Sequence, residues 1–110
     1  RLSDRIISGG VNVDPEEVAA CLLTHPGVAE VAVVGVPDPE WGERLVALVV
    51  PEPGEAAPGQ EALRALTREA LAPPKRPKEY RFRASLPLNP NGKVDRNAVR
   101  ALFRERQGDR

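Results

Sequence analysis

Two apolar segments near the middle of the chain constrain the fold more than any other feature. Val28–Val36 is rich in β-branched residues, and Leu45–Val50 is wholly apolar. β-Branched side chains fit the pleated surface of a sheet better than they fit a helix. A short apolar run bounded by turn residues indicates a largely buried strand, and Pro37, Asp38 and Pro39 separate the two segments. The sequence therefore predicts two buried strands that follow one another along the chain.

The flanking segments predict the elements that surround these strands. Gly9 and Gly10 lie between two short apolar segments, which is the pattern of a tight β-hairpin. Asp14 and Pro15 are typical of the first residues of a helix. The predicted order is a hairpin (5–8 and 11–13), a helix from residue 15, strands 28–36 and 45–50, a helix (61–71), a strand (80–83) and a last helix capped by Asp95. This is an α+β domain, with a small N-terminal β-hairpin followed by a three-stranded sheet covered by helices.

The composition limits what kind of protein this is. The 110 residues make one domain, 1–110, and 41% of them are apolar, which is enough for a modest core. No apolar run approaches the roughly 20 residues of a membrane-spanning helix. A single cysteine excludes a disulfide framework and a Cys-rich metal site. Because the chain has no methionine and no apolar leader, we expect an excised or processed piece of a larger protein from a reducing, cytoplasmic compartment.

The formal net charge of zero hides an asymmetry between the two halves of the chain. Residues 1–60 carry three basic and ten acidic side chains, whereas residues 61–110 carry 13 basic and six acidic ones. A basic half can attract a polyanion. Nucleic acid is one candidate, but four aromatic residues supply little base stacking, and a small phosphorylated ligand fits at least as well. The alternative is that the two halves simply attract each other.

The usual catalytic signatures are missing. There is no G-x-G-x-x-G or G-x-S-x-G motif, and Gly92-Lys93 lacks both the upstream glycine and the following Ser or Thr of a phosphate-binding loop. His25 is the only histidine, so a multi-histidine metal site is excluded. The residues alone predict an α+β domain without a self-contained active site.

Lys93 is the first of three features with chemical potential. It is one of three lysines in a chain with 13 arginines, and it follows a glycine in a turn-rich loop. A flexible ammonium in this position could reach into the pocket of another domain and neutralise developing negative charge. The alternative is an ordinary solvated lysine after a turn.

The other two features suit a thin, charged ligand. Gly9 and Gly10 leave the backbone uncovered, which permits close approach by a ligand, although the same pair is also simply a good hairpin turn. The segment 75–78 packs three cations into four residues, which suits phosphate unless the segment is merely solvated. Trp41, the only tryptophan, is either a hydrophobic lid or a plate that contacts the ligand.

Several motifs occur together in one order along the chain. They are RLSDRIISGGVNVDPEEV (1–18), HPGV (25–28), VGVPD (34–38), WGE (41–43), KRPK (75–78) and LPLNPNGKVDR (86–96). In this order they resemble the small C-terminal domain of acyl- and aryl-CoA synthetases, which are adenylate-forming, AMP-binding enzymes. The resemblance covers nearly the whole chain, from Arg1 to about Phe103.

The resemblance implies a two-step reaction. A carboxylate attacks ATP to give an acyl-adenylate and pyrophosphate, and the thiol of CoA then displaces AMP. A large N-terminal domain, absent from this chain, would hold most of the pocket for ATP, Mg²⁺ and a fatty or aromatic acid. The small domain would swing between the two steps and be inactive alone.

For the adenylation step, the resemblance implies that Lys93 stabilises the carboxylate and the α-phosphate, and that Arg1 contacts the ribose hydroxyls of AMP. Ser3 occupies the hinge position, where Asp or Lys is usual, so Asp4 is included as a second hinge candidate. Lys93 is also an expected target of a protein lysine acetyltransferase, because acetylation would remove the charge that adenylation needs.

For the thioester step, the resemblance implies a CoA site on this domain. The residues implied are Gly9, Gly10 and Trp41 along the pantetheine path, and Lys75, Arg76 and Lys78 near the CoA nucleotide. Pro74 stands where an aromatic residue often precedes the first cation. The alternatives are a carrier-protein thiol as acceptor, a free-standing module that binds CoA or another polyanion, and a purely structural domain.

Overall fold

The two central apolar segments form an antiparallel pair in the computed structural model, which describes residues 4–54 and 57–108. Strands β3 (Val28–Asp38) and β4 (Gly42–Pro51) pair in register from Glu30 opposite Val50 to Asp38 opposite Gly42. The prediction that the prolines end the first strand at residue 36 is wrong by two residues. Within the described residues β3 pairs with β4 alone, so the missing N–H of Pro37 costs no ladder hydrogen bond on a second side.

The other edge of β4 carries two further neighbours. β1 (Ile6–Ser8) reaches β4 through the pair Ser8 and Gly42, and it forms the predicted hairpin with β2 (Val11–Val13). Farther along, β5 (Glu79–Phe82) pairs with β4 in parallel. The α+β prediction is confirmed, with one difference: the hairpin is continuous with the main sheet, which has five strands within the described residues.

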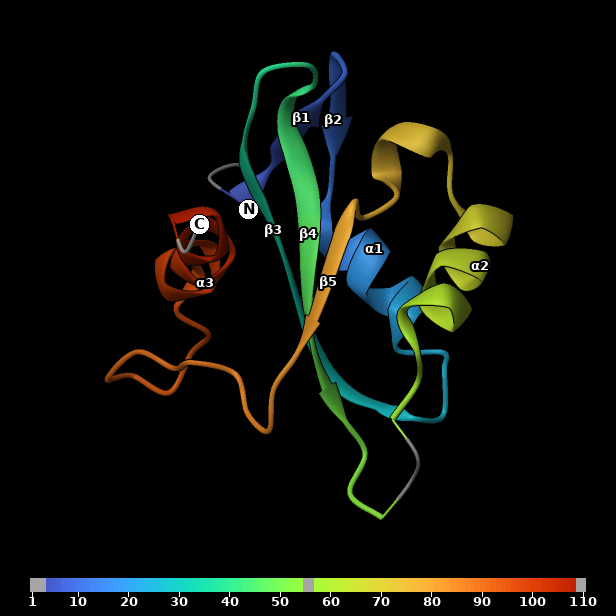
Figure 1. Ribbon diagram of the computed structural model, residues 1–110, viewed down its shortest axis with the longest axis vertical. Helices are drawn as coiled ribbons and strands as arrows, with labels where there is room; N and C mark the ends of the chain where they lie inside the picture. The colour runs from blue at the N-terminus through green and yellow to red at the C-terminus, as the bar shows by residue number, and fades with distance from the viewer. Residues whose placement is uncertain (1–3, 55–56, 109–110) are drawn as a thin grey trace.

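Helices cover both faces of the sheet (Figure 1). α1 (Pro15–Leu22) and α2 (Gln60–Ala70) lie on one face, and α3 (Arg96–Gly108) lies on the other. Alternate residues of β3 and β4 point into two separate cores, which explains why residues 31–34 and 45–50 are apolar at every position rather than at every second one. One core combines Val33, Leu45, Ala47 and Val49 with Val18, Leu22 and Leu63, and the other combines Val34, Val46 and Leu48 with Val99 and Phe103.

Helices α1 and α3 begin where the sequence predicts, and α2 begins one residue earlier than predicted. The carboxylate of Asp14 accepts a hydrogen bond from Glu16 N at 2.9 Å at the start of α1, and that of Asp95 accepts one from Ala98 N at 3.0 Å at the start of α3. A short 3₁₀ turn, η2 (Pro73–Lys75), joins α2 to β5. None of the described helices combines the length and apolar character that crossing a bilayer requires.

Candidate functional site

Two turns meet at one end of the sheet. The β1–β2 turn at Gly9 contacts the β3–β4 turn at Trp41, because Gly9 N donates to Trp41 O at 2.8 Å. Gly9 has φ +58°, and a Cβ placed on it would lie 2.9 Å from Trp41 Cε3. Gly10 has φ +81° and nothing within 4 Å of such a Cβ. The indole therefore packs directly on the backbone of Gly9, while the backbone of Gly10 is open.

Lys78 joins this group from the segment before β5. Its Nζ lies 4.2 Å from the centroid of the Trp41 ring, which is cation–π distance. The structure thus brings together three of the residues singled out in the sequence, Gly9, Trp41 and Lys78, from three separate parts of the chain.

A cationic cavity adjoins Lys78. Its volume is about 140 Å³, and it is lined by Arg64, Thr67, Arg68, Arg76, Pro77 and Lys78. The sequence singled out Arg76 and Lys78 but missed Arg64 and Arg68. The available signal was their spacing of four residues, which places both on one face of a helix. Four cationic side chains around one cavity make it a candidate site for phosphate groups.

Three of these residues, Arg64, Thr67 and Arg76, also have structural contacts. Arg76 donates to the main-chain oxygens of Leu71 at 2.8 Å and Arg68 at 3.2 Å, and thereby caps the end of α2. The Arg64 guanidinium lies 5.5 Å from the ring centroid of Tyr80, whose hydroxyl is 3.4 Å from Thr67 Oγ1. Burial raises the pKa of Tyr80, against the opposing effects of the Thr67 hydrogen bond and the Arg64 charge.

Lys75 is separated from the cavity. Its Nζ forms an ion pair with Glu17, at 3.1 Å from Oε1 and 3.3 Å from Oε2. This contact links the basic half of the chain to the acidic half, and the pair of Arg96 Nε with Asp4 Oδ1 at 3.6 Å does the same. Part of the charge asymmetry therefore serves internal attraction.

Lys93 projects from an ordered loop. Asn89 Oδ1 accepts hydrogen bonds from Asn91 N at 2.8 Å and Lys93 N at 3.1 Å, and Asn89 N donates to Lys93 O at 2.7 Å. Gly92, at φ +83°, closes the turn. The side chain of Lys93 is exposed, and it forms no hydrogen bond or ion pair with the residues that the structure describes.

The remaining candidates are placed as follows. Arg1 and Ser3 lie outside the described residues. Asp4 is half-buried beside Arg96, where burial lowers the pKa of the arginine and the Asp4 charge opposes that shift. His25 Nδ1 accepts from Gly27 N at 2.9 Å, which is a turn contact. Across residues 4–54 and 57–108, no three His, Cys, Asp or Glu side chains come together as metal ligands.

The two groups of candidates occupy different parts of the domain. The Gly9 and Trp41 turns lie at one end of the sheet, at the top of Figure 1, whereas the loop that carries Lys93 lies below α3 on the opposite face of the sheet from α1 and α2. A single ligand-binding surface therefore does not include both.

The chain is similar in sequence to known proteins. Residues 17–93 match the family described as AMP-binding enzyme C-terminal domain. The chain is 50% identical over 97 residues to a sulfoacetate–CoA ligase of Cupriavidus necator, covering 87% of this chain and 19% of the relative. It is 44% identical over 103 residues to a fatty acid–[acyl-carrier-protein] ligase of Streptomyces coeruleorubidus, covering 94% of this chain and 20% of the relative.

A solved structure shows the same fold. The amide bond synthetase McbA of Marinactinospora thermotolerans superimposes with a TM-score of 0.88 at 45% identity, over 94% of this chain and 21% of that one. The chain thus spans about a fifth of the length of the proteins it matches.

Proposed function

Because this chain belongs to the AMP-binding enzyme C-terminal domain family, we propose that it is the small mobile domain of an ATP-dependent carboxylate–CoA ligase. The observation that supports the proposal is the separation of the loop that carries Lys93 from the turns that carry Gly9 and Trp41. Lys93 serves adenylation, and the group formed by Gly9, Trp41 and Lys78 serves thioester formation. The domain must rotate to present each in turn to one active site.

In the adenylation step, a carboxylate oxygen attacks the α-phosphorus of ATP and pyrophosphate leaves. Negative charge builds up on the reacting oxygens, and a single ammonium screens it best where water is excluded. The ordered backbone of the Asn89–Lys93 loop supports this role, because it fixes the point from which the exposed side chain of Lys93 extends. ATP and its Mg²⁺ would bind mainly to the N-terminal domain, with Arg1 on the ribose and the hinge at Ser3 and Asp4.

In the thioester step, the CoA sulfur attacks the acyl carbonyl and AMP leaves. The pantetheine arm is thin, and the open backbone at Gly10 beside the Trp41 indole offers it a wall without side chains. Lys78 lies between this wall and the cationic cavity, so the phosphates of CoA would meet Lys78, Arg76 and the two arginines of α2. Lys75, which is paired with Glu17, would act at the margin of this site.

The test separates the two half-reactions in the full-length enzyme that contains this domain. We expect Lys93→Ala to slow pyrophosphate exchange by about 100-fold or more, while CoA consumption from supplied acyl-adenylate survives. We expect Lys78→Ala to slow CoA consumption from supplied acyl-adenylate, while pyrophosphate exchange survives. Arg104→Gln, which removes an exposed charge from α3, serves as the matched control. If Lys93→Ala leaves both half-reactions unchanged, its catalytic role is wrong.

The acceptor thiol is the main alternative. The similarity to a ligase named for an acyl-carrier protein favours a carrier-protein thiol as the second candidate. The cationic cavity favours CoA, because its four basic side chains suit the phosphate groups of the CoA nucleotide. Offering the adenylated enzyme free CoA and a phosphopantetheinylated carrier protein in competition distinguishes the two.

Lys93 is also proposed as a site of regulation by a protein lysine acetyltransferase. Its side chain is exposed on a protruding loop, and acetylation would remove its charge. We expect Lys93→Gln to mimic the acetylated enzyme and to lose pyrophosphate exchange as Lys93→Ala does. An acetylated enzyme that keeps full exchange activity would contradict this.

A further inference from the structure

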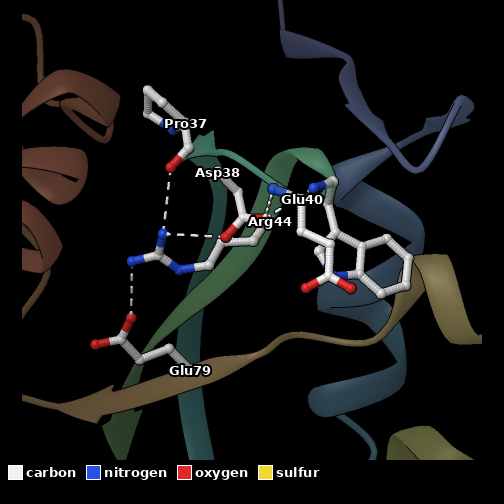
Figure 2. Close-up of polar contacts among 6 residues, drawn as sticks. Pro37, Asp38, Glu40, Arg44 and Glu79 are labelled. Atoms are coloured by element: carbon white, nitrogen blue, oxygen red, sulfur yellow. Dashed lines mark hydrogen bonds and ion pairs between the residues drawn. The ribbon is translucent and has the colours of Figure 1, made fainter.

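The turn between β3 and β4 is organised by one carboxylate. Asp38 Oδ2 accepts hydrogen bonds from Glu40 N at 3.0 Å and from Trp41 N at 2.8 Å (Figure 2). These two bonds fix the path of the chain as it leaves β3, and therefore fix the point from which the Trp41 side chain starts.

Arg44 holds the same carboxylate from the opposite side. Its Nη1 lies 3.7 Å from Asp38 Oδ1 and donates to Pro37 O at 3.2 Å, while its Nη2 donates to Glu79 Oε1 at 3.3 Å. Figure 2 shows the guanidinium of Arg44 between Pro37, Asp38 and Glu79. One arginine on β4 thus ties the turn to both β3 and β5.

The burial of these groups separates them from an ordinary surface ion pair. The side chains of Arg44, Asp38 and Glu79 are only 17%, 16% and 20% exposed. Partly buried charges interact more strongly than exposed ones, and a network of several such bonds holds its geometry more tightly than a single bond. The partly buried contacts of Arg44 with Pro37, Asp38 and Glu79 therefore support a fixed geometry for the turn that carries Trp41.

We propose that Asp38 and Arg44 are positioning residues that hold the Trp41 indole against Gly9 and so set the width of the pantetheine path. Neither side chain touches the ligand. The inference rests on the proposed function, because it assigns to these residues an effect on the thioester step through Trp41.

Half-reaction kinetics in the full-length enzyme test the proposal. Loss of positioning in an otherwise intact site commonly costs 10-fold to 100-fold. We therefore expect Asp38→Ala to raise KM for CoA by about 10-fold or more, with pyrophosphate exchange within about twofold of wild type. Asp38→Asn, which keeps an oxygen able to accept from Glu40 N and Trp41 N, should recover much of the loss. Glu40→Gln is the control, because Glu40 contributes only its main-chain N–H to the turn.

A double-mutant cycle decides whether Asp38 acts through Trp41. In the Trp41→Ala background, Asp38→Ala should have no further effect on KM for CoA, since there is no indole left to position. Additive effects of the two substitutions would overturn the proposal. The proposal would also be overturned if Trp41→Ala raised KM for CoA and Asp38→Ala left it unchanged.

Tryptophan fluorescence of the 110-residue chain provides a measurement independent of activity. Trp41 is its only tryptophan, so acrylamide quenching reports the exposure of that indole alone. We expect Asp38→Ala and Arg44→Ala to increase quenching of Trp41 while the circular dichroism of the chain stays unchanged. Quenching equal to that of the wild-type chain would overturn the positioning role. If Trp41→Ala leaves both half-reactions unchanged, the CoA path is wrong, and the quenching result still decides whether Asp38 holds the indole.

Discussion

Gly9 has no free space for a side chain, because the Trp41 ring lies where a Cβ would go. Gly9→Ala introduces two costs, a left-handed backbone at φ +58° and a contact of 2.9 Å with Trp41 Cε3. Gly10→Ala introduces only the first, since nothing lies within 4 Å of its Cβ position at φ +81°. We expect urea unfolding to show a loss of about 1 kcal/mol for Gly10→Ala and about 2–3 kcal/mol for Gly9→Ala.

The difference between the two variants measures how firmly the indole is held. Equal losses would mean that Trp41 moves aside without cost, and they would also weaken the case for a fixed pantetheine wall.

Tyr80 predicts a pH dependence of stability on the alkaline side. Burial raises its pKa in the folded chain above the ordinary value of 10.0, so the native state keeps the phenolic proton after the unfolded state has lost it. The contribution to stability is complete below pH 10 and is lost as pH rises through the folded-state pKa. Cys21, whose pKa burial also raises above 9.0, acts in the same direction.

Urea unfolding of the chain between pH 8 and 11 tests this expectation. In a Cys21→Ala background, the free energy of unfolding should fall above pH 10, and Tyr80→Phe should flatten that fall. A Tyr80→Phe curve parallel to its parent would show that another group causes the decline.

At this scale the sequence singles out residues of distinctive type, but not the residues that hold them in place. Lys93, Gly9 and Trp41 stand out by type and by local pattern. Asp38, Arg44 and Glu79 do not, because Arg44 and Glu79 are 35 positions apart and meet only through the register of β4 and β5. Charged residues in a chain that is 29% charged carry no signal of their own.

Among the elements, α3 is attached to the sheet through two arginines and through its apolar residues Val99 and Phe103. Arg96 donates to the main-chain oxygen of Val33, and Arg100 donates to that of Gly35. Both oxygens belong to β3, which has a single neighbouring strand among the described residues. Such bonds satisfy polar groups on an edge strand and prevent other chains from pairing there.

Replacing one of these arginines should loosen the helix. Arg96→Met keeps an apolar stem but removes the bond to Val33 O and the ion pair with Asp4. We expect a loss of about 2 kcal/mol in thermal or urea unfolding, since bonds to charged groups contribute roughly 1.5–3 kcal/mol. Arg104→Met, at an exposed position of the same helix, is the control, and equal stability of the two variants would contradict the role of Arg96.

Element types were predictable, but strand partners and ends were not. The β-branched run at 28–36 and the apolar run at 45–50 predict strands because burial on both faces suits them. The parallel pairing of β5 depends on how α2 packs across the sheet, which no local pattern encodes. The extension of β3 to Asp38 depends on Pro37 lying on a strand whose single partner, in the part of the chain that the structure describes, is β4, which is again a property of the assembled sheet.

For the whole molecule, the distinction between a ligase domain and a free-standing binding module is testable with the isolated chain. We expect no CoA thioester formation from a carboxylate, ATP and Mg²⁺ with the 110 residues alone, and activity when the chain is joined to an N-terminal domain. A binding module would bind CoA alone, with an affinity that falls steeply between 50 and 200 mM salt, and would gain no ligase activity from such a domain. Thioester formation by the joined enzyme separates these outcomes, and isothermal titration measures the binding of CoA to the isolated chain.

The parallel position of β5 has a consequence for how the domain is made. An antiparallel neighbour can be reached through a tight turn, whereas a parallel one requires the chain to cross the sheet first, here by way of α2. During synthesis from the N-terminus, β1 to β4 emerge and pair while β5 and α3 are still missing. Until α3 arrives, the sheet face that carries Val34, Val46 and Leu48 is exposed to water. Helix α3 is therefore the element that covers the exposed apolar face of the newly formed sheet. We expect a chain truncated before residue 96 to aggregate.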